Sequence, residues 1–352
     1  MGINNFALGG ATKYMATSDV ASDEPISPLS GAPNASGLAQ TDSVELITCE
    51  SRNISTVLDV SLERCAVPGR LHRVNVCMGL RWPHNGHEGS SVKLRALAEY
   101  AATRPAHALL VYTDADALCN AAPASLSAEA VRKRWHRLAR GHAHAVVYQA
   151  EPWCWAPNGP HQGQRQCSSR LLGRYRARSE QPLHPDWRCP RFLNGGAFAG
   201  LAGTVALMLH AQVNATGLPC YLHDDQCVAT HTMLSAVDGA LTSERALASA
   251  IAAAGATVLV DVHEVFFAAA AAATTGGVGC VACGNVRCFC GKRAEWARDA
   301  TTALPPLARP TAYHERCNIP NSTFPPLFIH PNGPAKPYLM PALLHLLNLS
   351  MG

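Results

Sequence analysis

The sequence predicts an α/β fold built around a mostly parallel central sheet. Short apolar runs rich in β-branched residues occur at residues 109–112, 143–149 and 257–262. Runs of this kind are typical of strands that are buried on both faces of a parallel sheet. Segments with apolar residues at helical spacing separate these runs, for example at residues 94–101 and 128–140. The alternation of the two patterns indicates an α/β domain.

The length and composition are those of a globular chain. The chain has 352 residues, of which 48% are hydrophobic and 15% are charged, and this suffices for a sizeable core. Its formal net charge is +4 without any basic run, which argues against a nucleic-acid-binding protein. Residues 1–42 are rich in Ser, Ala, Gly, Pro and Asn and lack periodicity. We therefore expect a disordered leader at residues 1–42, followed by a single domain at residues 43–350.

Cysteines and glycosylation sequons favour an oxidising compartment. The chain contains 14 cysteines, which is many for a cytosolic enzyme. Five Asn-x-Ser/Thr triplets would permit glycosylation in a secretory lumen, at Asn34, Asn53, Asn214, Asn321 and Asn348. The first thirty residues show no signal peptide, and no apolar stretch is long enough to span a membrane. We expect the lumen of the ER or Golgi, with the cytoplasm as the alternative.

The remaining elements follow from the same two patterns. Further strands are expected at residues 44–49 and 71–78 and just before His330. Helices are expected at residues 53–64, 128–140, 204–213, 227–234 and 243–254, with another that begins near Ser90 or Ser91, either of which could cap it. Residues 156–190 are polar and rich in Gly, Pro and Arg, so we expect a long loop. Loops of this length are usually functional or mobile.

Two carboxylates follow the apolar run at residues 109–112. Asp114 and Asp116 leave this predicted strand with only Ala115 between them. Ligands of open α/β sheets bind at the carboxyl ends of the strands. Two carboxylates at this spacing can both reach one hard cation, which prefers oxygen ligands. A metal that carries a nucleotide diphosphate is the favoured ligand, and an ordinary surface turn is the alternative.

Three other residues are candidates for binding a ligand. Lys93 lies near the start of a predicted helix, where the helix dipole disfavours a cation. Lys93 either binds an anionic ligand or, as the simpler interpretation, is solvated on an exposed face of the helix. Trp155 follows a predicted strand and is either part of the core or part of a platform for a sugar or base. Asn194 offers an amide that can form two hydrogen bonds, and Gly195 and Gly196 give a backbone that a ligand can approach closely.

A second acidic pair and a cysteine cluster complete the motifs. Asp224 and Asp225 begin a predicted helix; they either form a site in which each raises the pKa of the other, or complement the helix dipole. The cluster has the spacing of a zinc knuckle, and two local disulfides explain it equally well. Its members are Cys280, Cys283, Cys288 and Cys290. We expect it to be structural.

Six motifs occur in the order and approximate spacing of one family. They are TDAD, AEPWCW, RFLNGGAFAG, HDDQ, LVDV and IHPNGPAK. In these motifs, which span residues 44–344, the chain resembles the glycosyltransferase domain of the multifunctional procollagen lysyl hydroxylases. That domain transfers hexose to hydroxylysine or galactosyl-hydroxylysine. The resemblance implies a GT-A fold, a Rossmann-like α/β sandwich with Mn2+ and a UDP-sugar at the strand ends.

The resemblance also implies roles for individual residues. It makes Asp114, Asp116 and His330 the metal ligands, although a single such histidine would otherwise be an ordinary buried residue. It assigns Asp224 and Asp225 to the handling of the donor sugar and the acceptor. Residues implied to lie near the UDP-sugar are Trp155 beside the sugar, Lys93 at a phosphate, and Asn332 and Lys336 in a turn that faces the diphosphate.

The expected function is therefore that of a Mn2+-dependent hexosyltransferase. It would transfer glucose from UDP-glucose or galactose from UDP-galactose to hydroxylysine or galactosyl-hydroxylysine in collagen-like sequences. The alternatives are a catalytically weak UDP-sugar-binding module, a transferase acting on hydroxyproline, serine or a glycan, and a metal-dependent hydrolase or nucleotidyltransferase. The single residue between Asp114 and Asp116 and the short acidic run at Asp224 depart from the family pattern. These departures bear on the identity of the acceptor more than on the binding of the metal.

Overall fold

The computed structural model describes most of the expected domain. The described residues are 43–65, 71, 73–81, 89–120, 126–151, 154, 169–178, 191–216, 218, 224–235, 244–263, 265–275, 278–283, 286–291 and 326–331. The expected leader at residues 1–42 lies outside them. No helix among the described residues is both long and apolar enough to cross a membrane.

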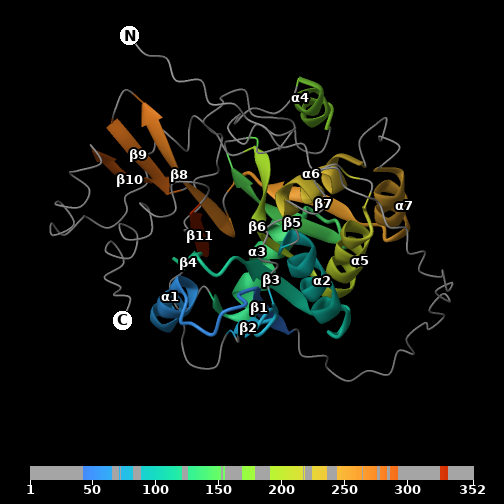
Figure 1. Ribbon diagram of the computed structural model, residues 1–352, viewed down its shortest axis with the longest axis horizontal. Coiled ribbons are helices and arrows are strands. Elements are labelled where there is room, and N and C mark those ends of the chain that lie inside the picture. The colour runs from blue at the N-terminus through green and yellow to red at the C-terminus, as the bar shows by residue number, and fades with distance from the viewer. Residues whose placement is uncertain are drawn as a thin grey trace, which may run out of the picture. The chain divides into compact units, whose positions relative to one another are not determined.

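A six-stranded sheet forms the centre of the described chain, in the order β2-β1-β3-β6-β5-β7 (Figure 1). Its strands are β1 (Val44–Thr48), β2 (Arg73–Asn75), β3 (Leu109–Thr113), β5 (Ala145–Glu151), β6 (Phe192–Leu201) and β7 (Thr257–Asp261). β1 pairs in parallel with β2 and β3, and β5 pairs in parallel with β7. Only β6 is antiparallel to its neighbours in this sheet. The prediction of an α/β fold with a mostly parallel sheet is confirmed, and the arrangement is compatible with a Rossmann-like fold.

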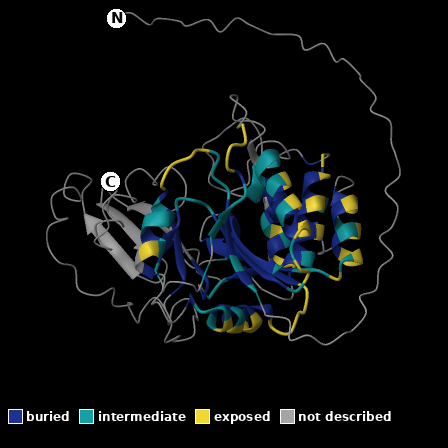
Figure 2. Ribbon diagram, turned by 90° about the horizontal axis from the view of Figure 1, so that it is seen from below, coloured by how far each residue is buried: buried dark blue, intermediate teal, exposed yellow. Residues whose placement is uncertain are grey.

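Helices cover both faces of this sheet (Figure 2). The helices are α1 (Val57–Cys65), α2 (Gly89–Ala102), α3 (Ala128–Ala139), α4 (Ser169–Arg176), α5 (Ala202–Val213), α6 (Asp225–Ser235) and α7 (Arg245–Ala253). Leu110 and Tyr112 of β3 belong to the core shared with α2 and with α4 to α7, whereas Leu109 and Val111 belong to the core shared with α1 and α3. Both faces of β3 are therefore buried, which explains why its sequence is apolar throughout.

A second sheet brings two distant parts of the chain together. It has the order β10-β9-β8-β11-β4 and consists of β4 (Leu118–Cys119), β8 (Phe267–Thr275), β9 (Val278–Cys283), β10 (Val286–Gly291) and β11 (Phe328–Pro331). β11 is antiparallel to β4, with Ile329 opposite Leu118. Because β4 begins two residues after Asp116, this pairing places His330 of β11 near the acidic turn.

Most predicted elements are present, but several begin or end elsewhere. The helix expected at residues 53–64 begins only at Val57, because the backbone N–H of Thr56 donates to Asp59 Oδ2 at 2.8 Å and the N–H of Asp59 donates to Thr56 Oγ1 at 3.2 Å. This reciprocal cap fixes the first turn. The strand expected at residues 71–78 shortens to β2, and α2 begins at Gly89, so that Ser90 and Ser91 lie inside the helix.

Several elements were not predicted from the sequence, among them the strands β4, β8, β9 and β10 of the second sheet. Part of the expected loop at residues 156–190 forms α4, so that prediction was wrong for residues 169–176. The glycine-rich segment at residues 192–201 forms β6, a buried strand between β3 and β5. Glycine disfavours strands when it is considered locally, and here the pairing on both sides overrides that preference.

Disulfides link segments near the acidic turn. Cys49 is bonded to Cys77, which joins the chain segments that follow β1 and β2, and Cys65 of α1 is bonded to Cys119 of β4. Such bonds persist in oxidising compartments. The side chains of the cysteine cluster at residues 280–290 lie outside the described part of the chain, so both interpretations of it remain predictions.

Candidate metal centre

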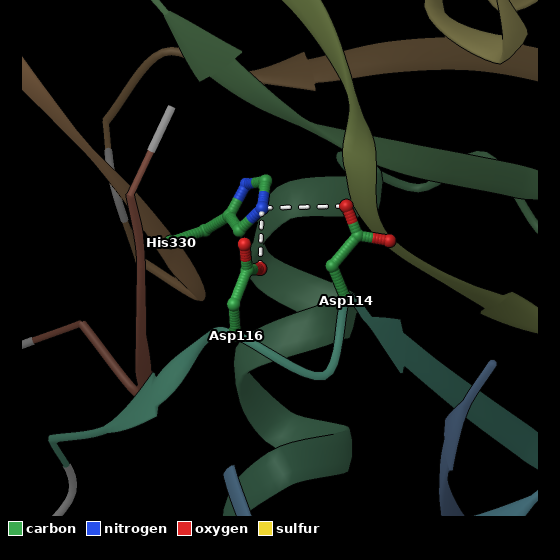
Figure 3. A group of neighbouring side chains, drawn as sticks. All are labelled: Asp114, Asp116 and His330. Atoms are coloured by element: carbon green, nitrogen blue, oxygen red, sulfur yellow. Dashed lines mark ion pairs between the residues drawn. The ribbon is translucent and has the colours of Figure 1, made fainter. Parts of the chain in front are cut away.

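Asp114, Asp116 and His330 form a group that could hold a metal ion (Figure 3). One ligand atom from each residue can be chosen so that all three lie within 4.8 Å of one another. His330 Nε2 lies 3.3 Å from Asp114 Oδ2 and 3.2 Å from Asp116 Oδ1. Carboxylate oxygens together with an imidazole nitrogen suit divalent cations such as Mn2+ and Zn2+. The structure therefore brings together the three residues predicted to be metal ligands.

The turn after β3 gives the two aspartates their positions. The backbone N–H of Asp114 donates to the carbonyl of Gly196 at 2.8 Å, and the N–H of Ala117 donates to the carbonyl of Asp114 at 3.0 Å. The first bond ties the turn to β6, and the second closes the turn on itself. The chain then leaves the six-stranded sheet and enters the second sheet as β4. Both carboxylates consequently lie where the two sheets approach one another.

The electrostatic environment of His330 favours a positive charge at Nε2. The residue is only 3% exposed. Burial acts to lower the pKa of His330, but hydrogen bonding and charge from Asp114 and Asp116 outweigh it and raise the pKa above its usual 6.5. Nε2 nevertheless lacks a hydrogen bond of good geometry among the described residues. Two carboxylates beside an unsatisfied nitrogen are an arrangement that a bound cation would complete.

Lys93 binds the opposite side of Asp114. Its Nζ lies 2.8 Å from Asp114 Oδ1 and 2.5 Å from Asp225 Oδ2, and the hydroxyl of Tyr112 also donates to Asp114 Oδ1. The simpler expectation of a solvated Lys93 was therefore wrong, since its side chain is only 12% exposed. Burial alone would lower the pKa of Lys93, but the two carboxylates hold it well above its ordinary value. Asp114 thus keeps Oδ2 directed toward His330.

The two aspartates at the start of α6 make different contacts. Asp224 Oδ1 accepts a hydrogen bond from the backbone N–H of Cys227 at 3.1 Å and so caps the helix. Burial and the nearby charge of Asp225 raise the pKa of Asp224 to about 6. Asp225 instead contacts Lys93 and through it is connected to Asp114. The cap agrees with the interpretation of the pair as acids at a helix N-terminus, and a role of the pair in a site remains a prediction.

The two glycines after Asn194 allow other parts of the protein to approach the backbone closely. A Cβ on Gly196 would lie 2.6 Å from His330 Nδ1 and closer still to Cε1, and one on Gly195 would lie 2.9 Å from the backbone of Gln226. Gly195 and Gly196 lie where the pairing register between β5 and β6 shifts. Asn194 accepts from the N–H of Gly196 at 2.8 Å and donates to Gln226 Oε1 at 3.3 Å. We expected a ligand at this backbone; among the described residues, His330 and α6 approach it.

Not every residue predicted to bind a ligand can be placed. Trp155, Asn332 and Lys336 lie outside the described residues, and their roles remain predictions. Several further residues contact the centre or adjoin it and were not predicted from the sequence. These are Tyr112, Gln149, Glu151 and Gln226. Gln149 and Glu151 are polar residues at the end of an otherwise apolar buried strand, and this contrast could have identified them.

Glu151 is a buried carboxyl group two positions after Gln149. It is fully buried and accepts a hydrogen bond from the side-chain amide of Gln226. Burial raises the pKa of Glu151 to about 8, because removing the carboxylate from water disfavours its charged form. The folded protein consequently holds this proton more tightly than the unfolded chain does. The free energy of unfolding should therefore fall as the pH rises from about 4.5 to about 8.

We expect Glu151→Gln to remove this part of the pH dependence. Gln is isosteric with the protonated acid and stays neutral, so its advantage over the wild type should grow between pH 5 and pH 8 and then level off. The scale is about 1.4 kcal/mol for each unit of pKa difference. Urea unfolding at several pH values measures the difference in unfolding free energy between the variant and the wild type. Glu99→Gln, on the exposed face of α2, is the control for replacing a carboxyl group by an amide. A difference between variant and wild type that does not change with pH would contradict the raised pKa.

No protein-family model and no curated protein matches this chain, so the geometry of Asp114, Asp116 and His330 is the basis for the functional interpretation.

Proposed function

We propose that the protein is a Mn2+-dependent glycosyltransferase of the GT-A type, which transfers a hexose from a UDP-sugar to a protein-linked acceptor. The observation that carries the proposal is the convergence of Asp114, Asp116 and His330 where β3 ends. Ligand sites of open α/β sheets lie at such strand ends. The resemblance of the motifs makes hydroxylysine or galactosyl-hydroxylysine of collagen-like sequences the favoured acceptor.

The charges around the centre suit this reaction. Breaking the bond between sugar and phosphate leaves UDP with additional negative charge, which a bound Mn2+ would stabilise as a Lewis acid. Asp114, Asp116 and His330 Nε2 would hold the ion. Lys93 is a second, permanent cation 2.8 Å from Asp114, and in the proposed reaction it stabilises a donor phosphate.

The acidic pair at the start of α6 is proposed to act on the sugar side of the reaction. Asp225 lies 2.5 Å from Lys93 and therefore adjoins the metal centre. Asp224 has a pKa of about 6, so it can exchange a proton near neutral pH. Either carboxyl group would orient the acceptor hydroxyl or stabilise positive charge on the sugar. The two disulfides support a place for this reaction in an oxidising secretory lumen.

The test measures UDP release and sugar transfer by the purified protein with UDP-glucose and UDP-galactose, with and without Mn2+. Peptides that contain hydroxylysine or galactosyl-hydroxylysine serve as acceptors. We expect release to require Mn2+ and to be lost in Asp116→Ala and His330→Ala, since each removes a proposed ligand. His136→Ala, an exposed histidine of α3, should retain full activity and controls for loss of an imidazole.

Other outcomes would identify a different function. Mn2+-dependent UDP binding without turnover would indicate a sugar-nucleotide-binding module. Release of free sugar with no glycosylated acceptor would indicate a hydrolase. Transfer to hydroxyproline, serine or a glycan but not to hydroxylysine would keep the enzyme class and change the acceptor.

A further inference from the structure

His330 has a second polar neighbour on the side away from the aspartates. The Oε1 atom of Gln149 lies 3.0 Å from His330 Nδ1. Gln149 is on β5 of the central sheet and is fully buried, and His330 is on β11 of the second sheet. The contact therefore joins the two sheets directly beside the proposed metal centre.

The chemistry of the contact determines where the ring carries its hydrogen. A carbonyl oxygen can only accept a hydrogen bond, so Nδ1 must be the donor. A ring that binds a metal must be neutral and so has one N–H; with that hydrogen on Nδ1, Nε2 carries the lone pair. Nε2 is the nitrogen that lies 3.2 to 3.3 Å from the carboxylates of Asp116 and Asp114. The hydrogen bond from Nδ1 thus prepares the other nitrogen to bind a metal.

The amide nitrogen of Gln149 does not explain why a polar side chain occupies this buried position. Its Nε2 has no hydrogen-bond partner among the described residues. A buried amide with an unsatisfied N–H is unfavourable, and the preceding residues of β5, Val146 to Tyr148, are apolar. The hydrogen bond to His330 therefore accounts for the presence of a buried amide at this position.

Gly196 makes this contact sterically possible. Any Cβ at Gly196 would lie 2.6 Å from Nδ1, the atom that donates to Gln149. The ring is thus confined by Gly196 of β6, by Gln149 of β5 and by the two aspartates. Three separate elements fix its orientation, and Gln149 is the neighbour that accepts a hydrogen bond from Nδ1.

We propose that Gln149 is a positioning residue that holds His330 as the Nδ1–H tautomer and so presents Nε2 to a divalent cation. This inference rests on the proposed metal centre. Partners of this kind orient metal-binding histidines and increase their basicity, and losing one typically lowers metal affinity by about 10-fold to 100-fold.

The test is a titration of the full chain with Mn2+, in which free Mn2+ is measured by its electron paramagnetic resonance signal. Gln149→Met has a similar shape but no acceptor, and we expect it to weaken Mn2+ binding by about 10-fold to 100-fold. Gln149→Glu keeps an acceptor oxygen and should recover most of the affinity. Gln212→Met is the matched control, because Gln212 is equally buried but bonds to Thr232 and Tyr148 instead. It should leave the affinity unchanged.

The Mn2+ titrations could overturn the proposal in two distinguishable ways. If the wild type binds Mn2+ and Gln149→Met binds it equally well, the metal centre stands and the role of Gln149 is wrong. If the wild type does not bind Mn2+, the proposed centre itself is wrong. A measurement on the unaltered chain guards against a Gln149→Met variant that fails to fold. In the Zn2+-bound protein, two-bond proton–nitrogen spectra should show the His330 hydrogen on Nδ1, and a hydrogen on Nε2 would contradict the proposal.

Discussion

Gly196→Ala is expected to abolish measurable Mn2+ binding, although it changes no residue that could bind a metal. The added Cβ would lie 2.6 Å from His330 Nδ1, well inside van der Waals contact, so either the ring or β6 must move. Movement of the ring separates Nε2 from both aspartates. A displacement of about 1 Å at a reactive centre can cost about 100-fold in rate, and we expect at least that loss in Mn2+-dependent UDP release.

The same substitution should also reduce stability. Overpacking a closely packed interior typically costs about 1–3 kcal/mol, which denaturant unfolding of the metal-free protein would measure. Gly173→Ala is the matched control, because a Cβ there meets nothing within 4 Å and Gly173 lies inside α4. That variant should be slightly more stable, by about 0.5–1 kcal/mol, with unchanged Mn2+ affinity. A Gly196→Ala protein that binds Mn2+ as tightly as the wild type would show that the ring has other space to occupy.

The parts of the fold that the sequence predicts are those determined by local pattern. Residues 109–112 are apolar on both faces, so a buried strand follows from the sequence, and Asp114 and Asp116 lie at its end by adjacency. Val131, Trp135 and Leu138 recur at helical spacing, which predicts a helix, and all three are buried in α3. In such segments the local preference and the tertiary environment agree.

The parts that were missed depend on contacts between distant segments. The glycines of β6 do not indicate a strand by themselves, and the strand follows only from the pairing with β3 and β5. Gln149 acquires a role only when β11 brings His330 beside it, and His330 was identified through the resemblance of its motif rather than from its own neighbourhood. The ion pairs of Lys93 were missed because both of its carboxylate partners, Asp114 and Asp225, are distant in sequence and lie on other elements. Local sequence does not encode these distances.

Lys93→Met is expected to destabilise the metal-free protein strongly. Lys93 Nζ lies between Asp114 and Asp225, and so it joins α2 to the end of β3 and to the start of α6. Without it, two largely buried carboxylates face one another with no cation between them. Removing one partner of a buried ion pair typically costs about 3–5 kcal/mol. Chemical unfolding in the presence of a chelator measures this loss, and Lys133→Met on the exposed face of α3 is the control, expected to change stability by less than about 0.5 kcal/mol.

Added Mn2+ should reverse part of this loss. The substitution removes a positive charge 2.8 Å from Asp114, so the field at the proposed metal position becomes more negative and Mn2+ affinity should rise. The increase in melting temperature on adding Mn2+ should therefore be larger for Lys93→Met than for the wild type. UDP release should nevertheless fall, because the proposed contact between Lys93 and a donor phosphate is lost. This separation of tighter metal binding from weaker turnover distinguishes a charge that serves the substrate from one that merely stabilises the fold. If Mn2+ affinity fell together with stability, Lys93 would instead be needed to hold Asp114 in place for the metal.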